Sequence, residues 1–208
     1  MKSLRVGSVV FAVLVGAAAL VGCDGGSQPP TSPKAGTDPA GGAAAQEGPK
    51  GSLHDFKMKT IFGEERSLGD FRGKVVLVVN TASECGYTPQ YAGLEKLHER
   101  FEAKGFSVLG FPSNDFGAQE PGTDAEIATF CTSKFGVKFP MFSKITVKGS
   151  DKHPLYTFLT QAAPAGEVKW NFEKFLVGKD GGVKGRFPSA VEPEDEKLVL
   201  AIEKALGS

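Results

Sequence analysis

The stretch KVVLVVNTASECGYTPQYAGLEKL, residues 74–97, contains the signals for a strand, a turn and a helix in direct succession. Its opening run of valine and leucine is typical of a strand that is buried on both faces of a sheet. A polar turn with Cys85 in it follows, and Pro89 suits the first position of a helix. We therefore predict a helix over residues 88–104 with Thr88 as its cap.

The rest of the chain extends this unit into an α/β domain. A second apolar run at residues 106–112 completes a βαβ unit, and such units make parallel sheets. Further elements are predicted in the following order: a helix over 123–136 that starts with a capping box, a strand over 141–149, a short helix over 153–162, two strands within 169–187, and an amphipathic helix over 194–207. This order, with a cysteine in the first strand-to-helix turn, predicts a thioredoxin-like fold with a central mixed sheet flanked by helices.

The first 50 residues have the composition of targeting and tether segments. Lys2 and Arg5 precede an uncharged apolar run that ends in LVGC at Cys23. The pattern resembles the signal of bacterial lipoproteins, which makes residues 1–22 a signal peptide and Cys23 the lipid-attachment site; the alternatives are an ordinary signal peptide or an uncleaved anchor. Residues 23–50 are rich in Gly, Pro, Ser and Ala and are expected to be a flexible tether.

Residues 51–208 are the predicted folded domain, which has an ordinary size for one core. A lipid on Cys23 would hold this domain to a membrane of the bacterial cell envelope without spanning it. The formal net charge is zero and no basic stripe is present, so nothing favours nucleic-acid binding. The three histidines show no ligand spacing and no nucleotide-binding motif occurs, so we expect neither a metal nor an organic cofactor.

Cys85 is expected at the N-terminus of the predicted helix, where backbone N–H groups and the helix dipole stabilise an anion. Its polar surroundings favour a reactive thiolate over a buried structural thiol, which is the alternative reading. Thr88 occupies the position at which a Cys-x-x-Cys disulfide exchanger has its second cysteine. A thiolate without that partner can attack a peroxide bond and become a sulfenic acid, so the pattern favours peroxide chemistry.

Residues 52–207 resemble the glutathione peroxidase family, in its cysteine-containing, thioredoxin-dependent, monomeric phospholipid-hydroperoxide branch. Four motifs carry the resemblance: VVNTASECGYTPQYAGLEKL (78–97), LGFPSNDFGAQEPG (109–122), FCTSKFGVKFPMF (130–142) and KWNFEKFLV (169–177). The resemblance implies a thiol peroxidase that reduces hydrogen peroxide and organic or lipid hydroperoxides to water or alcohols. Its implied reductant is a thioredoxin-like protein or glutathione.

The resemblance also implies roles for individual residues. Cys85 matches the peroxidatic cysteine, and Gln119, Trp170 and Asn171 match the hydrogen-bond donors that complete the catalytic tetrad. Trp170 is otherwise read as a core side chain. Cys131 matches the resolving cysteine, whereas its place on an apolar helix face alone indicates a small buried hydrophobic residue. If Cys131 is buried in the reduced protein, its helix must unwind before the disulfide can form.

Three departures from the family pattern bear on function. Glu84 precedes Cys85 where many relatives have lysine, and an acidic neighbour disfavours a thiolate. Ser113 stands where relatives often have a further cysteine, and the short segment TQAAPAGEVKW (160–170) lacks the insertion of tetrameric relatives, which favours a monomer with an open site. Two other functions remain open on the residues: an exported thiol–disulfide oxidoreductase, and a sensor that passes peroxide oxidation to a partner.

Overall fold

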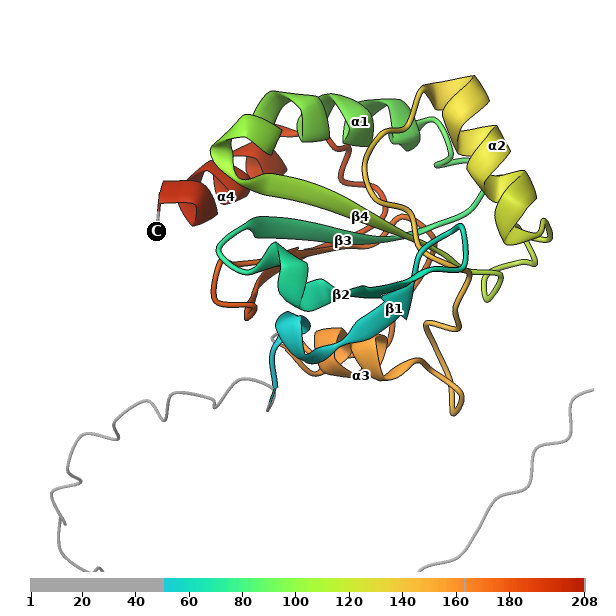
Figure 1. The fold of residues 1–208 in the computed structure, drawn as a ribbon, viewed down its shortest axis with the longest axis horizontal. Helices are drawn as coiled ribbons and strands as arrows, with labels where there is room; N and C mark the ends of the chain where they lie inside the picture. Colours follow the sequence, from blue (N-terminus) through green and yellow to red (C-terminus); the bar gives the residue numbers. More distant parts are fainter. Residues whose placement is uncertain (1–50, 163, 208) are drawn as a thin grey trace, which may run out of the picture. The chain divides into compact units, whose positions relative to one another are not determined.

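The computed structural model describes residues 51–162 and 164–207 (Figure 1). The predicted signal peptide, the lipid-attachment residue Cys23 and the tether up to residue 50 lie outside the described residues. Within the described part of the chain, no helix combines the length and the apolar character that crossing a membrane requires.

A mixed sheet of four strands, in the order β4-β3-β5-β6, forms the centre of the domain (Figure 1). β3 pairs in parallel with β4 and antiparallel with β5, and β5 pairs antiparallel with β6. A separate hairpin of β1 and β2 precedes this sheet. The strand bounds are β1 Lys57–Lys59, β2 Glu65–Ser67, β3 Val75–Thr81, β4 Phe106–Pro112, β5 Lys174–Val177 and β6 Val183–Phe187. The thioredoxin-like α/β architecture that the order of elements predicted is confirmed.

Helices cover both faces of the sheet (Figure 1). The side chains of β3 alternate between the faces: Val75, Leu77 and Val79 pack in one apolar cluster with α1 and α4, whereas Val76 and Val78 pack in a second cluster with α3. The helix bounds are α1 Gln90–Phe101, α2 Asp124–Phe135, α3 Pro154–Gln161 and α4 Glu196–Gly207, with short 3-10 segments at Leu53–Asp55, Leu68–Phe71 and Glu102–Lys104.

The helix α2 begins and ends as the sequence predicted. The Thr123 hydroxyl accepts a hydrogen bond from the Glu126 N–H at 3.3 Å, and the Glu126 carboxylate accepts one from the Thr123 N–H at 2.7 Å, which forms a capping box. Gly136 closes the helix with a left-handed φ of 65°. Ile127 and Cys131 lie buried on the face of α2 that packs on the core.

The strand predicted over residues 141–149 is wrong, because this segment forms isolated bridges in place of a ladder. The N–H of Lys144 donates to the carboxylate of Asp124 at 2.9 Å, and the N–H of Val147 donates to that of Asp115 at 2.5 Å. The N–H groups of Phe142 and Ile145 do bond to carbonyls of β4, but the side-chain oxygens at Lys144 and Val147 interrupt the regular pairing of a ladder. The segment passes the edge of β4 without extending the sheet.

Three segments meet at one edge of the sheet because of its register. Thr81 at the end of β3 lies opposite Pro112 at the end of the parallel strand β4. β5 runs the other way, so its first residue, Lys174, lies opposite Val79 near the same edge. The segments that leave β3 and β4 and the one that enters β5 are therefore neighbours, at the edge where open α/β sheets bind ligands.

Candidate active site

The first of these segments is the Cys85 turn (residues 82–88), which joins β3 to α1. The Thr88 hydroxyl donates to the Ala82 carbonyl at 2.9 Å and accepts from the Cys85 N–H at 3.0 Å. The prediction that Thr88 caps α1 is wrong: Pro89 occupies the cap position, and no side-chain hydrogen bond caps this helix. The Thr88 hydroxyl closes the turn around Cys85 instead.

The Cys85 side chain is nearly covered, with 7% of its surface exposed, and it forms no disulfide. The backbone N–H of Tyr87 points at its Sγ, with 3.4 Å between nitrogen and sulfur. The turn therefore places a backbone donor against the sulfur. The expected position just before a helix N-terminus is confirmed, since α1 begins at Gln90.

The second segment, the Gln119 loop (residues 113–122), lies against the Cys85 turn. The Glu84 N–H donates to the Gln119 carbonyl at 3.0 Å. The side chains of Gln119 and Asn171 also meet, because the Asn171 Nδ2 donates to the Gln119 Oε1 at 3.0 Å. Two of the residues that the resemblance singled out are therefore in direct contact, and one of them is bonded through its backbone to the neighbour of Cys85.

Trp170 precedes Asn171 in the segment that enters β5, and its side chain is 40% exposed. The ring packs against Phe116 of the Gln119 loop, with 5.6 Å between the ring centroids, and its backbone carbonyl accepts from the Asn80 Nδ2 at 3.0 Å. This exposure argues against a core role for Trp170. The expectation that Asn171 lies within a strand is wrong, because β5 starts only at Lys174 and Phe172 adopts a φ of 61° in the turn before it.

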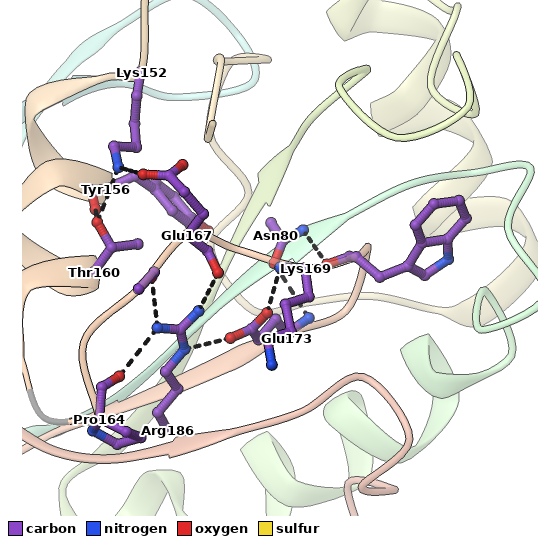
Figure 2. A network of polar contacts seen from close by, with 11 residues as sticks. Asn80, Lys152, Tyr156, Thr160, Pro164, Glu167, Lys169, Glu173 and Arg186 are labelled. Atoms are coloured by element: carbon purple, nitrogen blue, oxygen red, sulfur yellow. Dashed lines mark hydrogen bonds and ion pairs between the residues drawn. The ribbon is translucent and has the colours of Figure 1, made fainter. Parts of the chain in front are cut away.

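Asn80 is a positioning residue that the sequence reasoning did not single out. Besides holding the Trp170 carbonyl, its Oδ1 accepts from the Glu173 N–H at 3.2 Å (Figure 2). It is fully buried at the end of β3, so one amide side chain fixes both ends of the turn that carries Asn171. The available signal was a polar residue at the end of an otherwise apolar strand.

A buried ion pair braces the same segment from the other side (Figure 2). The Arg186 guanidinium pairs with the Glu173 carboxylate, and both side chains are at least nine-tenths buried. The Arg186 guanidinium also donates hydrogen bonds to three nearby backbone carbonyls, those of Pro164, Gly166 and Glu167. The second carboxylate oxygen of Glu173 accepts from the Lys169 N–H at 2.9 Å. This network fixes the course of the chain on both sides of Trp170.

Cys131 is buried on α2 with 1% of its surface exposed, and it is not bonded to Cys85. Burial raises the pKa of its thiol to about 11. The neighbouring Tyr91 hydroxyl lowers this pKa and the charge of Glu120 raises it. Both cysteines belong to one apolar cluster, so they lie on the same side of the sheet, with Cys131 held as a neutral thiol.

Glu120 follows Gln119 directly and was also missed by the sequence reasoning. It is fully buried, and neither of its carboxylate oxygens has a hydrogen-bond partner among the described residues. Burial raises the pKa of this carboxyl to about 7, the nearby Ser83 hydroxyl and Lys144 ammonium lower it, and Glu84 raises it. A carboxyl with this pKa can release or accept a proton near neutral pH.

Replacing Glu120 with glutamine should stabilise the fold at high pH relative to low pH. The pKa of Glu120 is raised in the folded state, so the folded protein binds the proton more tightly, and the parent loses stability as pH rises from about 4.5 to about 7. Glu120→Gln removes this loss. Urea unfolding should show the variant gaining on the order of 2 kcal/mol on the parent between pH 4.5 and pH 8. A difference that does not change with pH would contradict the assigned burial of charge.

Comparisons with known proteins identify the family. A model of the glutathione peroxidase family matches residues 53–160. The hydroperoxy fatty acid reductase gpx1 of Synechocystis sp. is 47% identical over 164 residues, which cover 74% of this chain and 96% of that protein. The thioredoxin/glutathione peroxidase BtuE of Escherichia coli is 46% identical over 172 residues, which cover 72% of this chain and 94% of that protein.

The fold agrees with these matches. The crystal structure of Trgpx in its apo form shares 41% of its sequence and superposes with a TM-score of 0.62, over 76% of this chain and 97% of that chain. A thioredoxin-family thiol:disulfide interchange protein from Chlorobium tepidum, at 17% identity and a TM-score of 0.58, shares the fold alone. The chain therefore belongs to the glutathione peroxidase family and is an enzyme that reduces hydroperoxides.

Proposed function

We propose that hydroperoxide reduction occurs at Cys85, with Gln119, Trp170 and Asn171 completing the site, and that Cys131 resolves the oxidised cysteine. The observation that supports this most is the pair of contacts at Gln119. Its carbonyl accepts from the Glu84 N–H and its side chain accepts from Asn171, so three distant segments meet next to the turn that carries Cys85. Convergence of neutral donors on one nucleophile is what O–O cleavage requires.

The first chemical step is attack of the Cys85 thiolate on the terminal oxygen of the hydroperoxide. The S–O bond forms, the O–O bond breaks, and the leaving alkoxide takes a proton, so that thiolate, ROOH and a proton become Cys85 sulfenic acid and ROH. Because Asn171 donates to the Gln119 Oε1, the amide N–H groups of Gln119 remain available to hold the peroxide. The indole N–H of Trp170 is a further donor at a partly exposed position.

The second step is resolution of the sulfenic acid by Cys131. The thiol attacks the Cys85 sulfur, a disulfide forms and water leaves. Cys131 is buried in α2, and a disulfide requires the two Cα atoms to approach within about 7 Å, so we propose that part of α2 unwinds for this step. A reductant of the thioredoxin type then attacks the disulfide.

Three further parts of the proposal concern context. The names of two relatives, a hydroperoxy fatty acid reductase and a thioredoxin/glutathione peroxidase, support lipid hydroperoxides as substrates and a thioredoxin-like protein or glutathione as reductant. The exposure of Trp170 supports a site that admits bulky peroxides, and the short segment 160–170 supports a monomer. We also propose that lipidation of Cys23 anchors the protein in the bacterial cell envelope, on the sequence pattern alone.

Turnover of a lipid hydroperoxide by the purified chain tests the proposal. Consumption of linoleic acid hydroperoxide should continue in the presence of thioredoxin, thioredoxin reductase and NADPH, and should be slower with glutathione and its reductase. Disulfide exchange on reduced, unfolded protein substrates is the matched control activity. Fast disulfide exchange without peroxide turnover would show that the protein acts as a thiol–disulfide oxidoreductase. A single oxidation of the protein by peroxide, without further turnover, would indicate a sensor.

A further inference from the structure

Glu120 lies near the Cys85 turn and also near Cys131 on α2. A pocket of about 430 Å³ lies between the Cys85 turn and α2. It is lined by Ser83 of the turn, by Glu120 of the Gln119 loop and by Ile127 of α2. Ile127 and Cys131 share the buried face of α2 and are one helical turn apart. Glu120 therefore faces the neighbours of Cys85 on one side and the helix that carries Cys131 on the other.

Several buried polar groups around Glu120 share its lack of hydrogen-bond partners. Among the described residues, none satisfies the hydroxyls of Thr81, Ser83 and Tyr91 or the two carboxylate oxygens of Glu120. The Tyr91 hydroxyl lies close to both Thr81 and the Cys131 thiol, and Ser83 lies close to Glu120. These groups form a buried polar cluster that reaches from Glu120 to the Cys131 thiol.

The charges that face Glu120 leave its carboxyl free to change protonation. The Lys144 ammonium is the neighbouring cation, but it donates to the backbone carbonyls of Glu120 and Gly122, at 3.0 and 2.6 Å, and forms no ion pair with the carboxylate. Glu84 adds a negative charge from the Cys85 turn, and the Cys131 thiol and the Tyr91 hydroxyl face it from α2 and α1. No ion pair therefore holds Glu120 in its charged form, and its burial outweighs the Ser83 contacts that favour this form, so the pKa of the carboxyl stays raised.

We propose that Glu120 accepts the proton of Cys131 during disulfide formation and passes it to the hydroxide that leaves Cys85. The proposal rests on the roles proposed above for the two cysteines. The Cys131 S–H bond breaks and its proton goes to the Glu120 carboxylate; the Cys131 sulfur then attacks the Cys85 sulfenic sulfur. As the S–S bond forms, the S–O bond breaks, and the departing hydroxide takes the proton from Glu120 and leaves as water. No oxidant beyond the peroxide already consumed is needed.

The fold gives this transfer a direction. While α2 is closed, burial holds the pKa of Cys131 at about 11, far above that of Glu120 at about 7, so the thiol keeps its proton. When the helix unwinds, Cys131 loses its burial and its pKa returns toward about 8.5, within roughly two units of Glu120. Proton transfer is efficient when the two groups have similar pKa values. Glu120 thus becomes an effective acceptor only once Cys131 has been released.

The test compares the two steps of the cycle in Glu120→Gln, which preserves the size of the side chain and removes the proton acceptor. Sulfenic acid formation, trapped with dimedone after mixing with hydrogen peroxide, should keep the rate of the parent within about twofold. Disulfide formation, followed by acid quench and mass spectrometry, should slow by about 100-fold, the usual scale for loss of a general base. The rate of disulfide formation should also lack the inflection near pH 7 that we expect for the parent.

Two further variants separate proton transfer from a purely structural effect. Glu120→Asp should recover part of the rate and the inflection, because it restores a carboxyl. Glu84→Gln, from the same pocket, should keep the inflection but move it to lower pH, because the charge of Glu84 raises the pKa of Glu120. Hydrogen exchange over residues 124–135 should match in Glu120→Gln and the parent; exchange slowed as much as disulfide formation would mean that Glu120 acts only by destabilising the closed helix α2, and would overturn the proposal.

The failures of the two proposals are distinguishable. Equal rates and equal pH profiles in Glu120→Gln and the parent, with a Cys85–Cys131 disulfide forming in both, would overturn the role of Glu120 and leave the cycle intact. A parent that forms sulfenic acid but never this disulfide would overturn both the resolving role of Cys131 and the role of Glu120.

Discussion

Replacing Cys85 with serine should reduce peroxide consumption by at least about 10³-fold, to the rate of buffer with reductant. A serine hydroxyl is not ionised at neutral pH and cannot accept the oxygen atom that a thiolate takes from a peroxide. The substitution is close to isosteric, and Cys85 is buried without a disulfide, so the fold should survive. Stopped-flow consumption of hydrogen peroxide measures the effect, and circular dichroism checks the fold.

Cys131→Ser is the matched control for that experiment, because it removes the other cysteine of the domain. It should oxidise at the parent's rate in the first turnover, which Cys85→Ser cannot do. If peroxide consumption persisted in Cys85→Ser and disappeared in Cys131→Ser, Cys131 would be the peroxidatic cysteine and Cys85 the resolving one.

With thioredoxin as the reductant, Cys131→Ser should consume about one equivalent of peroxide per chain and then stall, with steady turnover reduced by about 100-fold or more. Thioredoxin requires a disulfide to attack, and a sulfenic acid at the nearly covered Cys85 offers none. NADPH oxidation in the coupled assay gives the steady rate, and dimedone labelling identifies the stalled species.

Glutathione separates resolution inside the chain from resolution by a small thiol. If glutathione reaches Cys85 directly, Cys131→Ser should cycle with glutathione while it stalls with thioredoxin. Undiminished cycling with thioredoxin in this variant would show that another route resolves Cys85, and the proposed role of Cys131 would be lost.

The sequence predicted the elements whose signals are local. The valine-rich strand before Cys85, the Thr123–Glu126 capping box and the left-handed Gly136 all depend on residues within a few positions of each other, and all are present. The segment 141–149 has a pattern that also suits a strand. Two of its N–H groups, those of Lys144 and Val147, are taken by Asp124 and Asp115, which are distant in the chain, so the local pattern could not exclude a strand.

The site residues likewise divide into those that the sequence identified and those that depend on tertiary placement. The resemblance named Gln119 and Asn171, and the two side chains are in contact. Asn80 and Glu120 escaped notice because their importance depends on tertiary placement: one amide reaches across to the turn before β5, and one carboxyl is enclosed without a partner. Thr88 misled the prediction because a threonine before a proline can cap a helix or close a turn, and the choice depends on where the Ala82 carbonyl points.

The capping box of α2 implies that the two halves of that helix have different roles. The capping box at Thr123 and the bond from the Lys144 N–H to Asp124 hold its first turn, whereas the second half, which carries Cys131, is held by the Gly136 cap and by apolar packing. Unwinding from the Gly136 end can therefore bring the Cys131 sulfur toward Cys85 while the first turn of α2 stays in place. If the first turn stays in place, we expect α2 to close again in its original register after each catalytic round.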